Sequence, residues 1–249
     1  MNPLRRRIHT AMQTRGGAAA WTPASIAGLS LWYDATQIAG LVNNDPVATW
    51  TDASVNANNA TQGTVSARPT YKTNVQNSKP AVLFDGVDDV LAIGTPLTSA
   101  TYTIFIVQQT SGDGCLLGNG SAGGNTQFRI GYPASNKLQW YSVNSGSGGA
   151  NNPAESSALA TARTSFSAVA FASTGTTVNF YENNTARGGG GNSIAGTGDG
   201  IGSVGGIRAQ GTPVVLLTGY IAEVIIYNSA LSAGDRTLVF DYLAAKWAY

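Results

Sequence analysis

The sequence predicts an all-β domain closed by one short C-terminal helix. Charged residues form only 11% of the 249-residue chain and glycine occurs 31 times, a composition that suits short strands joined by polar turns. Runs rich in valine, isoleucine, threonine and aromatic residues recur between clusters of Gly, Asn, Asp and Ser, which is the pattern of strands and turns. A chain of this length fits one all-β domain.

The predicted strands are, in chain order, residues 29–33, 47–52, 81–84, 90–93, 102–108, 127–130, 138–143, 166–171, 177–182, 201–204, 214–217 and 220–227. Residues 102–107 are almost continuously apolar, which predicts a central strand. Asn183 and Asn184 predict a turn, because asparagine reaches left-handed conformations at low cost. Residues 145–152 and 188–200 are too rich in glycine to be predicted as strands.

The last thirty residues predict a strand locked by a helix. Residues 221–227 are apolar and β-branched, and Asn228 and Ser229 end this run. Ser232 stands three residues before Asp235, a spacing typical of the capping box that begins a helix. The apolar residues that follow at helical spacing are Leu238, Val239, Tyr242, Leu243 and Trp247.

Four stretches resemble one family in the order in which that family has them. They are Leu31-Trp32-Tyr33-Asp34-Ala35, residues 47–71, residues 79–91 and residues 219–249. Together they resemble the concanavalin A-like, laminin-G-type jelly-roll domain that is common in bacterial surface proteins and tailed-phage structural proteins. The resemblance implies a concanavalin A-like jelly-roll sandwich over residues 23–249, with a short C-terminal helix and an extended arm over residues 1–22. It says little about function, because this fold hosts lectins, hydrolases, adhesins and inert spacers alike.

The N-terminal arm is basic. Residues 1–20 contain Arg5, Arg6, Arg7 and Arg15 and no acidic residue, whereas the rest of the chain is slightly acidic. A secretory signal is not predicted, because residues 8–15 are too polar for its apolar core. Two interpretations stay open: a flexible terminus, or an anchor that becomes ordered on a negatively charged partner surface. Nucleic-acid binding is not expected, because a lone arginine triplet makes too few phosphate contacts.

Catalytic constellations are scarce in this sequence. Glycosidases of this architecture carry two glutamates close together on one strand, whereas Glu155, Glu182 and Glu223 are the only glutamates here and lie far apart. The single histidine, His9, lies in the arm and leaves no base for a serine or cysteine hydrolase. We therefore expect no enzymatic activity.

The best metal candidate is the acidic turn of Asp85, Asp88 and Asp89. Carboxylates on a tight turn suit Ca²⁺, although Asp85-Gly86 as a simple turn with solvated acids explains the same residues without an ion. No other cofactor is expected. The lone cysteine, Cys115, excludes a disulfide framework and is predicted to be a small buried residue.

Aromatic residues near loops are candidates for stacking on sugars. Trp140, Tyr141 and Tyr132 are the ones we select, and alternation along residues 138–143 places Trp140 and Tyr141 on opposite faces of the strand. The tryptophans in the stretches shared with the family, namely Trp32, Trp50 and Trp247, are predicted to pack in the core instead.

The resemblance and the basic arm together predict a non-enzymatic virion protein of a tailed phage. It would be a capsid decoration or a head or tail fibre subunit on the particle surface, anchored by its arm to the capsid or to other virion proteins. The resemblance also implies a homo-oligomer, with a trimer as the common form. The alternative is a lectin-like, carbohydrate-binding module that adheres to surface glycans. No membrane partner is expected, since no stretch approaches about eighteen consecutive apolar residues.

Overall fold

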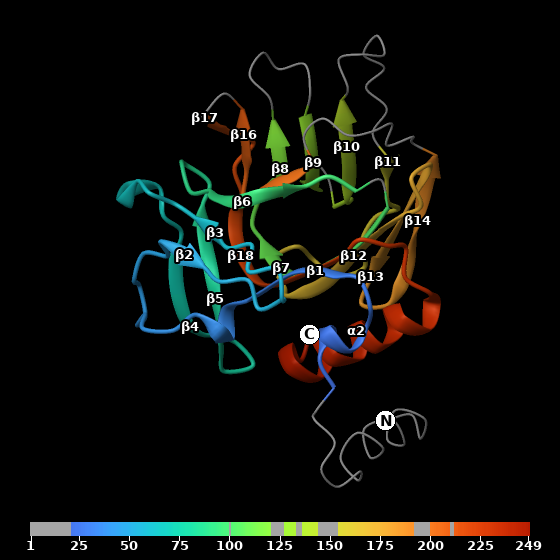
Figure 1. Ribbon diagram of the computed structural model, residues 1–249, viewed down its shortest axis with the longest axis horizontal. Coiled ribbons are helices and arrows are strands. Elements are labelled where there is room, and N and C mark those ends of the chain that lie inside the picture. Colours follow the sequence, from blue (N-terminus) through green and yellow to red (C-terminus); the bar gives the residue numbers. More distant parts are fainter. Residues whose placement is uncertain are drawn as a thin grey trace, which may run out of the picture.

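The computed structural model describes residues 21–249 except for residues 100, 121–126, 133–135, 144–153, 192–199 and 210–211. Within this part of the chain two eight-stranded antiparallel sheets pack face to face (Figure 1). The sandwich predicted from the sequence is therefore confirmed. Among the described residues no helix is long and apolar enough to cross a membrane.

Sheet A contains the central strands of the domain. Its order is β14 (Thr185–Gly191), β13 (Thr177–Glu182), β12 (Ser167–Ser173), β7 (Tyr102–Thr110), β18 (Thr218–Tyr227), β5 (Lys79–Asp85) and β4 (Thr70–Gln76). A further strand, β1 (Leu29–Asp34), pairs with the second half of β18, whereas β5 pairs with its first half.

Sheet B faces sheet A across the core. Its order is β11 (Ala154–Glu155), β10 (Gln139–Val143), β9 (Gln127–Tyr132), β8 (Gly114–Gly120), β15 (Ile201–Val204), β6 (Leu91–Leu97), β3 (Ala60–Thr61) and β2 (Thr49–Trp50). A separate hairpin pairs β16 (Ile207–Ala209) with β17 (Thr212–Val214). Single-turn 3₁₀ helices lie at Pro23–Ser25, Ala35–Gln37 and Val65–Ala67.

Sheet A is buried on both faces, which explains its apolar strands. Ile104 and Ile106 of β7 belong to the core between the sheets, while Phe105 and Val107 belong to a second cluster on the outer face. This outer cluster is covered by helix α2 (Ala233–Trp247). The prediction that residues 102–107 form a central strand is confirmed, with β7 lying between β12 and β18.

Helix α2 begins where the sequence predicts. The Ser232 hydroxyl oxygen accepts a hydrogen bond from the Asp235 backbone N–H at 3.1 Å and donates one to the Asp235 carboxylate at 2.8 Å. The helix buries Val239, Phe240, Leu243 and Trp247 against sheet A. Figure 1 shows α2 at the lower side of the molecule, far from the ends of β8, β9 and β10.

The described chain begins on the same side as α2. The Trp21 ring lies 5.7 Å from the Tyr242 ring and packs against the outer cluster of sheet A. Thr22 precedes the first 3₁₀ turn, and its carbonyl accepts from the Ser25 N–H at 2.9 Å. Residues 1–20, which carry the four arginines of the predicted arm, lie outside the described residues.

The glycine-rich end of β14 contradicts the sequence prediction. Residues 189–191 pair with β13, although residues 188–200 were predicted to contain no strand. A Cβ atom on Gly189 would lie 2.7 Å from the Val178 carbonyl oxygen, so the close approach of the two strands requires glycine. Residues 145–152, the other glycine-rich stretch, lie within the undescribed segment 144–153.

Candidate functional site

A pocket of about 250 Å³ lies on the outer face of sheet B, over β8, β9 and β10. Alternation along β9 directs Phe128 and Ile130 into the core, which leaves Arg129 and Gly131 on the opposite face. The same alternation in β10 buries Trp140 and leaves Gln139 and Tyr141 outside. The residues that line the pocket are Asp113, Gly114, Arg129, Gly131, Tyr132, Gln139, Val215 and Leu216.

The register of β9 and β10 brings the polar side chains together. Arg129 stands directly opposite Tyr141, and Gly131 stands opposite Gln139. The Arg129 guanidinium lies over the Tyr141 ring, 4.5 Å from its centroid, and Nη2 donates to Gln139 Oε1 at 2.9 Å. These contacts hold the guanidinium in one orientation.

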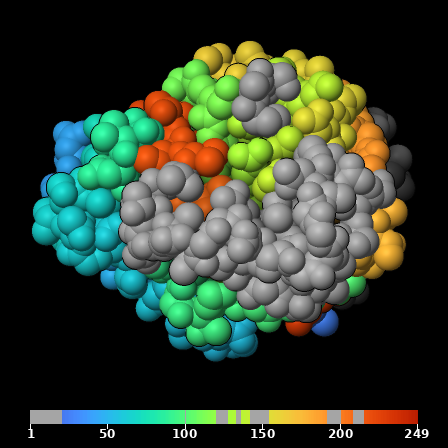
Figure 2. Space-filling model, turned by 90° about the horizontal axis from the view of Figure 1, so that it is seen from above, coloured from blue at the N-terminus to red at the C-terminus, as the bar shows by residue number. Residues whose placement is uncertain are grey.

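Glycines let the backbone close around the pocket. A Cβ atom on Gly131 would lie 2.1 Å from the Gly114 carbonyl oxygen, and one on Gly114 would lie 2.8 Å from the Leu216 carbonyl oxygen. Residues 215–217 therefore run directly against β8. Figure 2 shows orange-red parts of the chain, which follow residue 200, beside the green surface of this sheet. This close approach forms one wall of the pocket.

The wall contains a strained residue. Val215 has φ +52°, in the left-handed region that a β-branched side chain rarely adopts, and 40% of it is exposed. Its carbonyl accepts from the Cys115 N–H at 3.1 Å, which fixes it against β8. Strained backbone of this kind persists where the surrounding structure holds it, and it clusters at ligand sites. The sequence prediction of a strand over residues 214–217 is wrong beyond Val214, where β17 ends.

Two acidic side chains at the pocket are each paired. Asp113 accepts from Arg163 Nη1 at 3.0 Å, and Glu155 accepts from Gln139 Nε2 at 3.1 Å while lying 3.7 Å from Lys137 Nζ. The pocket therefore offers guanidinium, amide and carboxylate groups beside an aromatic ring. That combination suits a ligand with many hydroxyl groups.

The three predicted stacking residues separate in the structure. Trp140 is fully buried, 4.8 Å from the Phe128 ring, and Tyr132 is only 2% exposed. The Trp140 ring cannot therefore lie against a sugar from solvent, and the prediction is wrong for Trp140, because strand alternation directs it into the core. Tyr132 is also buried but belongs to the lining of the pocket. Tyr141 is the partly exposed member of the set, and its ring pairs with Arg129.

The acidic turn brings its three carboxylates together. Ligand oxygens of Asp85, Asp88 and Asp89 lie within 4.8 Å of one another. Asp85 Oδ1 accepts from the Val87 N–H at 2.8 Å, and Asp89 Oδ2 accepts from the Asp85 N–H at 2.9 Å, so the turn itself uses two of these groups. Burial, with a further contribution from the two neighbouring carboxylates, raises the pKa of Asp89 to about 6. The donor set suits a hard cation such as Ca²⁺, and this assignment stays a prediction.

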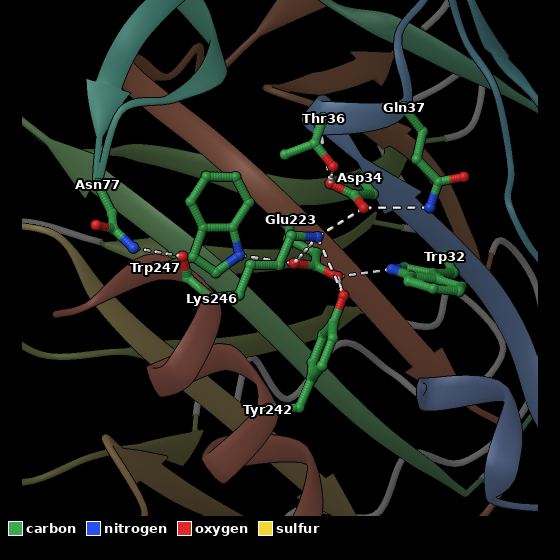
Figure 3. A network of polar contacts seen from close by, with 9 residues as sticks. All are labelled: Trp32, Asp34, Thr36, Gln37, Asn77, Glu223, Tyr242, Lys246 and Trp247. Carbon is green, nitrogen blue, oxygen red and sulfur yellow. Dashed lines mark hydrogen bonds and ion pairs between the residues drawn. The ribbon is translucent and has the colours of Figure 1, made fainter. Parts of the chain in front are cut away.

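Glu223 forms a buried polar cluster that the sequence analysis did not identify (Figure 3). Its two oxygens accept from Trp32 Nε1 at 2.6 Å, Tyr242 OH at 2.9 Å and Trp247 Nε1 at 2.6 Å, and Lys246 Nζ lies 2.9 Å away. Burial raises the pKa of Glu223, while the Lys246 charge and the hydrogen bonds from Trp247 and Lys246 oppose that rise. A lone acid within an apolar strand was the available signal.

A β-bulge explains why Glu223 reaches the helix. The pairing of β18 with β7 shifts between Ile221 and Glu223. Ile221 and Val224 therefore point into the inner core, whereas Ala222 belongs to the outer cluster, where Glu223 also finds its partners. The Glu223 cluster joins β1, β18 and α2, which indicates a structural role.

Glu182 is likewise committed to internal partners. Its carboxylate accepts from the backbone N–H groups of Ala160 and Thr161 at 2.8 and 2.9 Å and pairs with Arg187 at 2.7 Å. Like Glu223, it is about 1% exposed. Neither carboxylate is open to a substrate.

The two-sheet sandwich agrees with the family that the sequence of this chain matches. Residues 84–235 match the family Laminin_G_3, described as the concanavalin A-like lectin/glucanases superfamily. The chain belongs to this superfamily. No curated protein sequence matches the chain.

A solved structure has the same fold over most of the chain. Domain 4 of a GH43 extracellular arabinanase from Geobacillus stearothermophilus, in complex with arabinotriose, is similar with a TM-score of 0.57 and 16% identity, over 85% of this chain and 97% of that one. The CBM40 domain of the Ruminococcus gnavus IT-sialidase, bound to α2,3-sialyllactose, has a TM-score of 0.48 and 18% identity, over 57% and 83% of the two chains. At 16% identity the similarity to the arabinanase domain shows the fold, and with the family match it confirms the predicted concanavalin A-like sandwich.

Proposed function

We propose that this protein is a non-catalytic, lectin-like module that binds a carbohydrate in the pocket on the outer face of sheet B. The observation that carries the proposal is a concave site lined by Arg129, Gln139 and Asp113, in which the Arg129 guanidinium is fixed over the neighbouring Tyr141 ring. The similar arabinanase domain holds arabinotriose, which supports a sugar as the class of ligand.

The absence of catalysis is part of this proposal. Glycoside hydrolysis needs two accessible carboxyl groups on either side of the scissile bond. Glu182 and Glu223 are buried and paired with cations, and the more exposed Glu155 pairs with Lys137. These pairings support a binding role over a hydrolytic one.

Affinity electrophoresis and calorimetric titration against a panel of neutral and acidic glycans test the proposal. Tyr141→Ala should weaken binding of any glycan that the wild-type chain retains by about tenfold, since aromatic stacking contributes on the order of 1 kcal/mol or more. The matched control is Tyr181→Ala. The Tyr181 ring belongs to sheet A, and the Arg236 guanidinium lies over it at 4.5 Å from its centroid, as Arg129 lies over Tyr141. Binding that is equally weak in both variants, or no binding to any glycan, would contradict the proposal.

A second role is compatible with the first. We also propose that the chain is a tailed-phage virion component, a capsid decoration or fibre subunit, attached through Arg5, Arg6, Arg7 and Arg15. The basic composition of residues 1–20 supports it, and so does the position of Trp21 beside α2 on the outer face of sheet A. An anchor there would leave the pocket on sheet B facing outward.

Binding to stripped capsids tests the virion role. The whole chain should bind capsids from its source that lack this protein, and a chain without residues 1–20 should not. Equal binding by both chains, or by neither, would contradict attachment through the arm. The same preparation gives the number of copies on each particle, and so tests the expected homo-oligomer.

A further inference from the structure

The Arg129 guanidinium is held in place by neutral groups alone. Its hydrogen bond goes to the Gln139 amide oxygen at 2.9 Å, and it lies over the Tyr141 ring at 4.5 Å. Among the described residues, no carboxylate lies within the 4.0 Å that defines an ion pair with Arg129. Within the described part of the chain, its positive charge is therefore uncompensated at a site that is partly screened from water.

Two acids at or beside this site, Asp113 and Glu155, are paired with other cations. Asp113 pairs with Arg163 at 3.0 Å, and Glu155 lies 3.7 Å from Lys137. Among these described groups, Arg129, Arg163 and Lys137 accompany two carboxylates, and the charge left over belongs to Arg129. The field in the pocket favours an anion.

Other arginines outside the pocket use their donors differently. Arg68 donates to the carbonyls of Gln62 and Gly63, and Arg236 donates to the Leu231 carbonyl. These guanidinium groups stabilise the backbone of the domain itself. Arg129 makes no such bond to backbone among the described residues and instead lines a pocket.

We propose that the pocket selects a sugar residue that carries a carboxylate, with Arg129 as the residue that binds this group. This inference rests on the proposed carbohydrate-binding function. A guanidinium presents two parallel N–H groups that match the two oxygens of a carboxylate, and such pairs are among the strongest hydrogen bonds in proteins. Asp113, with 48% of its side chain exposed, accepts hydroxyl groups of the same sugar at the rim.

The test compares acidic glycans with their neutral methyl esters. Calorimetric titration would use oligogalacturonate and sialyllactose, each against its methyl ester, with dextran sulfate as a polyanion that has no carboxylate. The wild-type chain should bind at least one acid about tenfold more tightly than its ester, because a charge-assisted pair contributes on the order of 1.5 kcal/mol or more. Arg129→Gln should remove that preference, and Arg129→Lys should retain part of it.

Arg236→Gln is the matched control, since it removes an arginine that also lies 4.5 Å from a tyrosine ring. Thermal unfolding of each variant separates loss of binding from loss of fold. Equal binding of acid and ester would overturn the carboxylate inference and leave sugar binding in place. Failure to bind acid and neutral glycans alike would overturn the proposed function, and tight binding of dextran sulfate that survives Arg129→Gln would show a non-specific polyanion surface.

Discussion

Replacing Glu223 by glutamine should destabilise the whole domain strongly. The carboxylate accepts from three neutral donors, the indole N–H groups of Trp32 and Trp247 and the hydroxyl of Tyr242, and it also faces the Lys246 ammonium at 2.9 Å. Glutamine keeps one acceptor oxygen and replaces the other by an NH₂ group. In either orientation of the amide, two of the four donors then face another donor.

The size of the effect follows from burial. Glu223 is 1% exposed, so unpaired donors around it cannot turn to water. Each buried group left without a partner costs about 1–3 kcal/mol, and breaking a buried ion pair costs about 3–5 kcal/mol. Lys246 keeps its contact with Asp34 at 2.6 Å, which reduces the loss. We expect a decrease of about 3–4 kcal/mol in the free energy of unfolding, or on the order of 10 °C in Tm.

Urea unfolding followed by tryptophan fluorescence measures this loss. The control is Glu155→Gln, which removes the same charge from an exposed pair with Lys137 at 3.7 Å and should change stability by less than about 1 kcal/mol. A Glu223→Gln variant that unfolds within about 1 kcal/mol of the wild type would refute the reasoning, because the cluster would then contribute no more than a surface pair.

Three further predictions concern single residues. Val215→Gly should raise the free energy of unfolding by about 1 kcal/mol, because glycine adopts φ +52° without strain; a loss of stability in urea would contradict the strained backbone. Asp89 should make stability fall as pH rises from about 4 to about 6, because its raised pKa means that the folded chain binds the proton more tightly than the unfolded one. Asp89→Asn should abolish that fall in thermal unfolding, and Ca²⁺ should reverse it if the ion binds there. Cys115 should react with a thiol reagent only on unfolding, because complete burial raises its pKa to about 12, and rapid labelling of the native chain at neutral pH would contradict this.

The sequence predicted those strands and helix ends that are determined by residues close together in the chain. The apolar run at residues 102–107 and the Ser232–Asp235 spacing gave β7 and the start of α2 within a few residues. Both features are set by neighbours in sequence, so the chain alone contains them.

Elements that depend on distant contacts were not predictable in this way. The glycines at the end of β14 form a strand because β13 lies too close for side chains, and β-propensity carries no such signal. Alternation could place Trp140 and Tyr141 on opposite faces but could not say which face is the core. That choice follows from the packing of sheet B on sheet A.

The pocket itself arises from register. Arg129 meets Tyr141 because β9 and β10 pair residue 129 with residue 141, and Val215 reaches β8 only through the close approach at Gly114. An arginine between Phe128 and Ile130 marks an outward position, yet nothing in the sequence places it beside Gln139. The Arg129 site therefore required the structure.

The most direct test of the central claim is the footprint of a bound oligosaccharide on the isotope-labelled chain. Amide chemical shifts should be followed during titration with the glycan that binds best in the panel. Sugar binding in the pocket predicts that the largest changes gather at Gly114, Arg129, Gly131, Gln139 and Tyr141. Changes centred on α2, or on the far end of sheet B around β2 and β3, would contradict the account.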